Sequence, residues 1–278
     1  MNARLLFILL LFTIGALWYI IGYWRRKAGE AAFAAARLTE KSEERERYCR
    51  LAVMAGHREA CRMFCLLHPE RFDGHSPHKP FKLRGIRISF YGYYYPSRYN
   101  ALLNDEQRAF CHSIYQFKQG DIHGIEFFKT CMNALQLKKR PYHIMFMPCS
   151  NWIKYGQRFK RLDWYIGKHR QDLTSGLYDV DICNARESLH EAKGGEKRIL
   201  ERNYLITGKI KGKEIIIIDD VLTTGQSVVD YKEEIERCGG KVVAAIFYGK
   251  TLSMPSMLLV QIHVWGNHIA HIIERMTK

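Results

Sequence analysis

The chain has 278 residues, of which 47% are apolar and 26% are charged, and this composition argues against general disorder. Its 43 lysines and arginines outnumber its 28 acidic residues, which gives a net charge of +15. Such an excess favours anionic partners (polyphosphates, acidic lipid headgroups or nucleic acid) without choosing among them. The length leaves room for one α/β domain and a smaller attachment.

The N-terminal segment predicts a membrane anchor. Leu5 to Trp24 carries no charge, and a helix of that length spans about 30 Å, the thickness of the hydrocarbon core of a bilayer. Arg25, Arg26 and Lys27 follow it. A cleaved signal peptide is the competing interpretation, although its apolar region is normally about 7–15 residues long. We expect residues 1–27 to form a single-pass anchor in the cell (inner) membrane, with the rest of the chain in the cytoplasm.

Residues 28–80 predict a helical adaptor that ends in a linker. The last eight of these residues include glycine, serine and two prolines, a composition typical of linkers. His57, Cys61, Cys65 and His68 share one helix face. Because four ligands on one straight helix cannot surround zinc tetrahedrally, we predict no metal site there. The eight cysteines of the chain are scattered, which agrees with a reducing cytoplasm.

Residues 81–260 predict an α/β domain with a parallel sheet, and residues 261–278 a C-terminal tail. Strands are expected at Ile86 to Tyr91 and at Tyr142 to Met147 because these stretches are rich in β-branched and aromatic residues. Helix is expected to dominate between 101 and 136.

The stretch after residue 214 is the most informative part of the chain. Four consecutive isoleucines, 215–218, predict a strand buried on both faces, as in a parallel sheet. Asp219 and Asp220 stand at its carboxyl end, where open α/β sheets bind their ligands. A turn leads into a helix expected from Gln226 to about Cys238, and Lys241 to Tyr248 is expected to form the next parallel strand.

The turn and the two acids suit different groups of one ligand. A helix N-terminus offers free N–H groups and the positive end of a dipole, which suits a phosphate. The paired aspartates repel a phosphate, but they can accept hydrogen bonds from vicinal sugar hydroxyls or help hold a divalent metal. Phosphate and diol together indicate a ribose 5-phosphate. The residues expected to bind its phosphate are Thr223, Thr224, Gly225, Gln226 and Ser227.

Asp219 to Gly225, with the sequence DDVLTTG, also resembles the PRPP-binding motif of type I phosphoribosyltransferases. The resemblance extends over roughly residues 88 to 258 towards the ComF-like branch of that family. Ile114 to Asp121 is similar to the segment before that branch's first helix, and Met145 to Pro148 to its first strand. Arg202-Asn203 lies where the branch usually carries an Arg and an Asn. Phe159, Lys160 and Arg161 lie where it carries GFNQ, so basic residues replace its Asn and Gln.

The resemblance implies a parallel-sheet phosphoribosyltransferase fold that binds Mg-PRPP and transfers ribose 5-phosphate to a nitrogenous base, releasing pyrophosphate. Asp219 and Asp220 would be the catalytic pair that positions the ribose and stabilises its positive charge. Mg²⁺ would accompany PRPP as the cofactor, without a metal site of the protein's own. Pyrophosphate would contact the loop after the first strand and arginines of a closing hood: Pro148, Cys149, Ser150, Asn151, Arg198 and Arg202.

The departures from the ComF-like pattern keep a second hypothesis open. The fold would then sense PRPP or a nucleotide without catalysis, or serve DNA uptake with a helicase partner, as ComF-like proteins are thought to do. A purely structural membrane adaptor, attached to lipid through its N-terminal helix, would leave DDVLTTG unexplained. The sequence does not identify the acceptor base, and it leaves a homodimer open.

Overall fold

The computed structural model describes residues 3–122, 124–183 and 203–277. The chain divides into two compact units. Unit 1 comprises residues 1–74, 101–103 and 253–278, and unit 2 comprises residues 75–100 and 104–252. The described part of unit 1 is helical, whereas unit 2 is an α/β structure.

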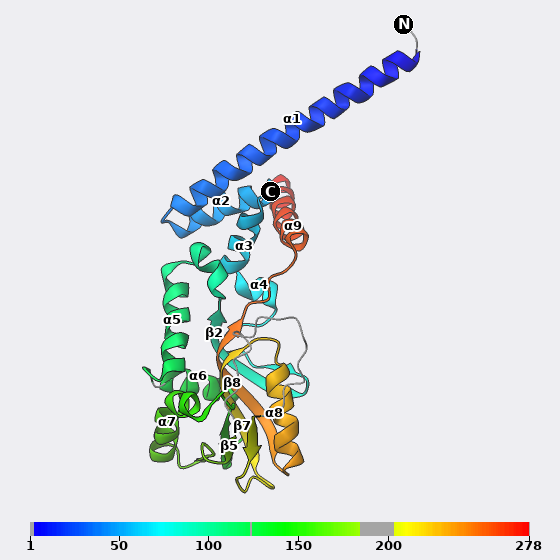
Figure 1. Ribbon diagram of the computed structural model, residues 1–278. Helices are drawn as coiled ribbons and strands as arrows, with labels where there is room; N and C mark the ends of the chain where they lie inside the picture. Colours follow the sequence, from blue (N-terminus) through cyan, green and yellow to red (C-terminus); the bar gives the residue numbers. More distant parts are fainter. Residues whose placement is uncertain (1–2, 123, 184–202, 278) are drawn as a thin grey trace. The chain divides into compact units, whose positions relative to one another are not determined.

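Unit 2 is built on a six-stranded sheet in the order β1-β2-β8-β7-β3-β4 (Figure 1). Only the pair between β1 and β2 is antiparallel in this sheet, so the predicted parallel sheet is confirmed. The strands are β1 (Phe81–Leu83), β2 (Ile86–Tyr94), β3 (Tyr142–Phe146), β4 (Leu173–Ser175), β7 (Glu214–Leu222) and β8 (Lys241–Thr251). A separate antiparallel pair joins β5 (Val180–Ile182) to β6 (Tyr204–Ile206).

Helices cover both faces of the sheet. Helices α5 (Asp105–Gln119), α6 (Ile125–Leu135) and α7 (Trp152–His169) lie on one side, and α8 (Gln226–Arg237) lies on the other (Figure 1). On the α5–α7 side, Ile216 and Ile218 join a large aromatic core. Because successive strand residues point to opposite faces, Ile215 and Ile217 point towards the α8 side. All four isoleucines are fully buried, as their sequence predicts.

Unit 1 consists of α1 (Ala3–Leu38), α2 (Ser42–Met54), α3 (Arg58–Leu67), α4 (Pro69–Asp73) and α9 (Met257–Met276). A short 3₁₀ helix, η1 (Ser97–Leu102), spans the division between the units. The core of unit 1 includes Ala36 of α1, Val53 of α2, Phe64 of α3 and Val260 of α9. Helix α9 takes in most of residues 261–278, the segment expected to be a C-terminal tail.

Helix α1 runs without a break through the residues expected to form the membrane anchor and into the expected adaptor. Among the residues that the structure describes, no helix has both the length and the apolar character needed to cross a membrane. The predicted transmembrane helix at Leu5 to Trp24 is therefore not supported.

Candidate functional site

The carboxyl end of β7 brings two acidic side chains to the edge where parallel sheets bind ligands. The side chains of Asp219 and Asp220 are only 13% and 9% exposed. Each carboxylate accepts a hydrogen bond from the next backbone N–H: Asp220 N donates to Asp219 Oδ1 (2.7 Å), and Val221 N donates to Asp220 Oδ1 (2.6 Å). The backbone therefore fixes both carboxylates, and each retains lone pairs for further donors.

The turn after β7 needs glycine at residue 225. Gly225 has φ +78°, and a Cβ atom there would lie 2.3 Å from Cδ2 of Leu83. An L-residue would meet both an unfavourable backbone conformation and a collision. The positive φ therefore favours glycine at this residue, and the absence of a Cβ atom leaves room for the Leu83 side chain of β1 against the turn.

The N-terminus of α8 follows directly and is suited to an anion. Gly225 is its N-cap and has no side chain to cap the helix, and no acidic residue lies in its first turn. Gln226 N donates a long hydrogen bond to Thr224 Oγ1 (3.4 Å). The other N–H groups of the first turn and the helix dipole favour a negatively charged ligand. Thr223, Thr224, Gln226 and Ser227 are exposed around this end, and Arg84 Nη1 donates to Gln226 Oε1 (2.6 Å). The five residues expected at a phosphate thus surround one helix N-terminus.

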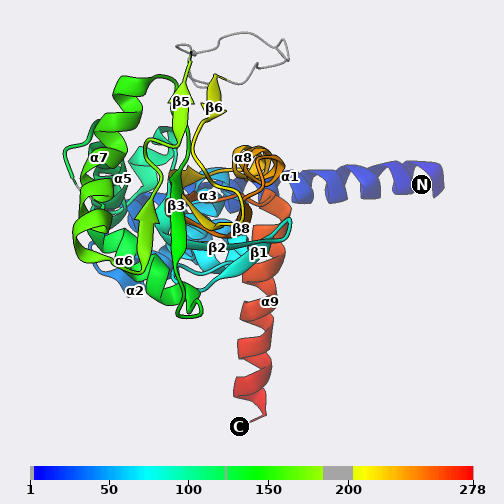
Figure 2. The same ribbon diagram turned by 90° about the horizontal axis from the view of Figure 1, so that it is seen from below.

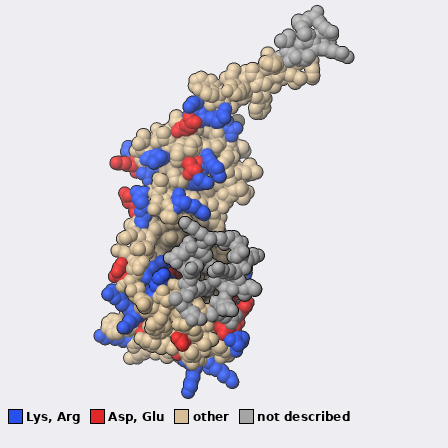
Figure 3. All heavy atoms as spheres, viewed as in Figure 1, with Lys and Arg blue, Asp and Glu red and all other residues tan. Residues whose placement is uncertain are grey.

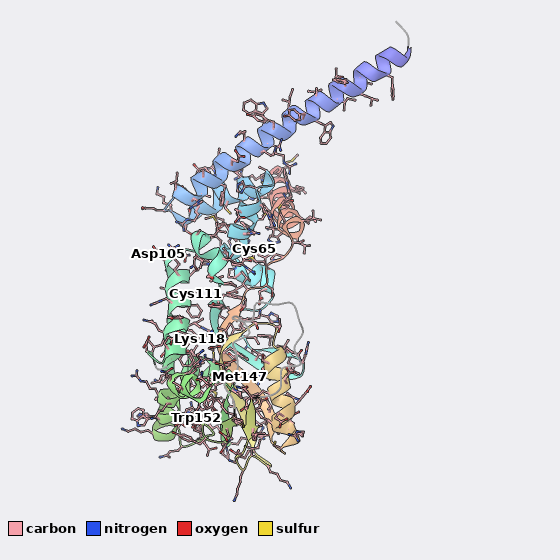
Figure 4. The ribbon with its side chains drawn as sticks, viewed as in Figure 1. Cys65, Asp105, Cys111, Lys118, Met147 and Trp152 are labelled. Carbon is pink, nitrogen blue, oxygen red and sulfur yellow. The ribbon has the colours of Figure 1, made fainter. Side chains whose placement is uncertain are left out.

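The loop between β3 and α7 lies beside β7. Met147 N donates to Ile218 O (2.9 Å), which attaches the start of the loop to β7. At its end, Asn151 caps α7 by accepting from Lys154 N (2.9 Å). Met147 and Trp152, labelled in Figure 4, mark the two ends of the expected pyrophosphate loop, Pro148 to Asn151. The structure brings this loop to the same edge of the sheet as the two aspartates.

Asn203, a residue distant in sequence, also contacts this loop. Its Nδ2 donates to Cys149 O (3.1 Å), and Ser150 O lies 3.4 Å from the same atom. These contacts tie the loop to a residue that is about fifty positions away in the sequence. Asn203 and Arg202 are the two residues that lie where the ComF-like branch usually carries an Asn and an Arg.

Two basic side chains contact the aspartates. Arg158 Nη1 of α7 lies 2.7 Å from Asp220 Oδ2 and 3.8 Å from Asp219 Oδ1. Lys118 Nζ, near the end of α5 (Figure 4), lies 3.5 Å from Asp220 Oδ2. The Arg158 side chain is 16% exposed, and its Nε has no hydrogen-bond partner among the described residues. Its Nη1 atom thus already occupies a carboxylate oxygen that a sugar hydroxyl would need.

Burial decides the charge of this cluster. Burial and the neighbouring Asp220 carboxylate raise the pKa of Asp219 to about 8, against the opposing effect of Arg158. Two carboxylates held this close share one low-dielectric site, so one of them retains its proton at neutral pH. Burial also raises the pKa of Cys149 to about 12. That thiol remains protonated, so Cys149 can contribute its backbone to the loop but no thiolate.

A cavity of ≈ 360 Å³ extends from Lys118 along α5, within the size range of small-ligand sites. Its walls include the aromatic side chains of Tyr94, Tyr95 and Tyr115. Lys118 is the residue that this cavity shares with the charge cluster, because it lines the cavity and also contacts Asp220. Neither aspartate is among the residues that line the cavity.

Arg198 and Arg202, expected to reach the pyrophosphate from a hood, lie outside the described residues. The aspartates, the turn and the loop lie within them and meet at one edge of the sheet.

Arg158 is not among the residues that the sequence predicts for this site. A signal was present: Arg158 follows Tyr155 by three residues and precedes Leu162 by four, and both are buried. An arginine next to the buried stripe of a helix is partly withdrawn from water, and a buried charge is normally paired with an acidic side chain. The same spacing connects Lys118 with buried Ile114.

Comparisons with known proteins support the assignment of this region. Residues 172–251 match the family of the phosphoribosyl transferase domain, a range that contains β7, the turn, α8 and β8. Orotate phosphoribosyltransferase of Sulfolobus acidocaldarius is 42% identical over 57 residues, which are 20% of this chain and 26% of that protein. The transcriptional regulator GfcR 1 of Methanosarcina barkeri is 30% identical over 63 residues, or 23% and 29% of the two chains.

These matches are local: the aligned parts make up 26% and 29% of the length of these curated relatives. The family match begins after β3 and the loop that follows it. What they support is a local similarity to phosphoribosyl transferase domains, which the family match places in residues 172–251.

Proposed function

We propose that unit 2 binds Mg-PRPP and transfers its ribose 5-phosphate to a nitrogenous base, releasing pyrophosphate. One observation carries the proposal: two largely buried carboxylates and a helix N-terminus with a glycine N-cap lie at the same end of β7, joined by a turn whose positive φ favours glycine. The domain match over residues 172–251 supports the same class of reaction.

In this proposal, different residues bind different groups of PRPP. The turn from Thr223 to Ser227 binds the 5-phosphate through backbone N–H groups and hydroxyls. Asp219 and Asp220 accept hydrogen bonds from the ribose hydroxyls and stabilise the positive charge that develops on the sugar as the bond to pyrophosphate breaks. The loop from Pro148 to Asn151 contacts the pyrophosphate, and Arg198 and Arg202 are proposed to complete that contact.

The two carboxylates also fit the expected cation. Mg²⁺ is usually held by one or two carboxylates together with phosphate oxygens of the substrate. The member of the Asp219–Asp220 pair that has lost its proton provides one such carboxylate. Bound with PRPP, the ion would neutralise charge on the departing pyrophosphate.

A second candidate is PRPP or nucleotide sensing without transfer, including an accessory role in DNA uptake. Arg158 favours it, because its Nη1 already occupies an oxygen of Asp220. The ribose hydroxyls would have to displace or share this contact. One of the similar proteins is a regulator by name.

Calorimetry tests the binding site. The full chain is titrated with PRPP in the presence of Mg²⁺, alongside the Asp219→Asn/Asp220→Asn double variant and Asp105→Asn as a control at an exposed position of α5. We expect the wild type and the control to bind and the double variant to lose binding. Equal binding by the double variant would remove the aspartates from the site.

Product analysis separates the two candidates. Release of pyrophosphate that requires an added base supports transfer. PRPP binding without base-dependent release supports sensing, and DNA binding that weakens steeply with salt supports the uptake role.

We further propose that α1 attaches the protein to the cell membrane, with unit 2 on the cytoplasmic side. The apolar side chains that support this are exposed, among them Phe12 (79%) and Trp18 (73%), and Arg25, Arg26 and Lys27 follow them. Protease added to inverted membrane vesicles should digest unit 2. Protection of unit 2 in that preparation would contradict the orientation.

A further inference from the structure

Helix α9 is apolar on two opposite faces. On one face, Val260 and Val264 are 1% and 4% exposed and join the core that α2 and α3 form. On the other face, large apolar side chains recur every three or four residues, so they form a single stripe along the helix. The residues of this α9 stripe are Leu258, Ile262, Trp265, Ile269, Ile272 and Met276.

The α9 stripe is exposed along its whole length. Ile262 is 59% and Ile269 is 52% exposed, and the stripe contains no charged residue. Figure 2 shows α9 projecting from the other helices of unit 1. With 20 residues, the helix is about 30 Å long. A contiguous apolar surface of this extent marks an interaction site.

The start of α9 meets the end of the apolar part of α1. Arg25 Nε of α1 donates to Ala55 O (3.1 Å), and Gln261 Nε2 of α9 donates to Val53 O (3.3 Å). Both helices are thus attached to the turn between α2 and α3. Among the described side chains in the projecting part of α1, Figure 3 shows no Lys, Arg, Asp or Glu before the helix reaches the other helices of unit 1. Two exposed apolar surfaces of unit 1 therefore converge on one turn.

We propose that α9 binds flat on the surface of a lipid bilayer, with the α9 stripe inserted at the boundary between headgroups and acyl chains. Helices that lie in this plane combine an apolar face with a polar one and hold aromatic residues such as Trp265 in the interface. The proposal deepens the membrane attachment proposed for α1, because the end of the apolar part of α1 places α9 at membrane level.

The width of the exposed face favours lipid over a second copy of the chain. A pairwise coiled-coil seam needs only a narrow apolar stripe, with charged residues beside it to select the partner. Leu259 and Ile273 extend the apolar face of α9 to one side and are 58% and 56% exposed. Arg275 is the one charge that adjoins the stripe on the opposite flank.

An environment-sensitive fluorophore tests this contact. The full chain is reconstituted into phosphatidylcholine–phosphatidylglycerol vesicles, with exposed Cys183 replaced by serine. The dye is attached to Ile269→Cys on the stripe, to His271→Cys on the opposite side of the helix, or to Leu17→Cys on α1. We expect the dye at 269 to emit several-fold more strongly than at 271, and nitroxide-labelled lipids to quench it.

The outcomes separate the two proposals. Quenching at 17 but not at 269 would overturn the inference for α9 and leave the α1 attachment intact, whereas quenching at neither site would overturn both. A bright signal at 269 that lipid nitroxides do not quench, and that grows with the protein-to-lipid ratio, would assign the stripe to a second copy.

Discussion

Unit 2 buries charged side chains, whereas unit 1 exposes apolar ones. In unit 2, Asp219, Asp220 and Arg158 lie together at the end of a strand, each less than a fifth exposed. In unit 1, α1 and α9 present large apolar residues to their surroundings. Burying charged side chains and exposing large apolar ones both cost free energy in an isolated folded chain. The contrast agrees with the two proposals, in which unit 2 binds a small charged ligand at an inward-facing site and unit 1 binds an apolar partner through outward-facing surfaces.

Removal of the arginine breaks the buried charge cluster most directly. In Arg158→Gln, both carboxylates lose their nearest cation, and we expect the free energy of unfolding of unit 2 to fall by about 3–5 kcal/mol. Lys160→Gln, at an exposed position of the same helix, should change it by less than about 0.5 kcal/mol. Denaturant titration measures both. Equal stabilities would mean that the cluster is not held by Arg158.

Arg158→Gln also sharpens the choice between transfer and sensing. If Arg158 only competes with ribose for Asp220, the variant should bind PRPP more tightly at a pH where it remains folded. Weaker binding in a folded variant would instead make Arg158 part of the PRPP site.

A substitution in the turn before α8 is expected to have the next largest effect on stability and on PRPP binding. Gly225→Ala should lose PRPP binding and about 1–3 kcal/mol of stability, because the left-handed backbone and the collision with Leu83 both oppose a side chain. Gly212→Ala is the matched control: its φ is +74°, but no atom lies within 4 Å of the added Cβ. We expect the control to show strain without loss of binding. If both variants bind PRPP normally, the turn does not hold the phosphate.

The raised pKa of Asp219 predicts a pH dependence of stability. Its folded-state value of about 8 exceeds the ordinary value of 3.8, so the folded state holds a proton that the unfolded chain releases. The contribution of this group to stability therefore falls as the pH rises from about 4 to about 8, and levels off above that. Unfolding free energies at successive pH values should show this decline in the wild type and not in Asp219→Asn. A parallel decline in the variant would assign it to another group.

The sequence predicted the parts of unit 2 that local pattern determines. The isoleucine run specified a strand buried on both faces, and DDVLTTG specified the turn that follows it. Arg158 and Lys118 were not predicted at the site because their acidic partners lie far away in sequence. A single basic residue does not indicate which acidic residue it contacts. In unit 1, the uncharged run in α1 was conspicuous, whereas the α9 stripe was not. Its apolar residues resemble those of a core-facing helix, and only the fold reveals that a different face is buried.

The smallest expected effect distinguishes the two faces of α9. Val264→Ala removes buried side-chain volume, and we expect local stability to fall by about 1–3 kcal/mol. Ile269→Ala removes exposed apolar surface, so in detergent it should change stability by less than about 0.5 kcal/mol. Hydrogen exchange of the α2 and α3 amides measures this local stability. In vesicles Ile269→Ala should instead speed the exchange of the α9 amides, because the stripe loses one of its lipid contacts. If the two substitutions lower the local stability equally in detergent, both faces of α9 are packed in solution. The distinction between a buried and an exposed side of α9 would then be wrong.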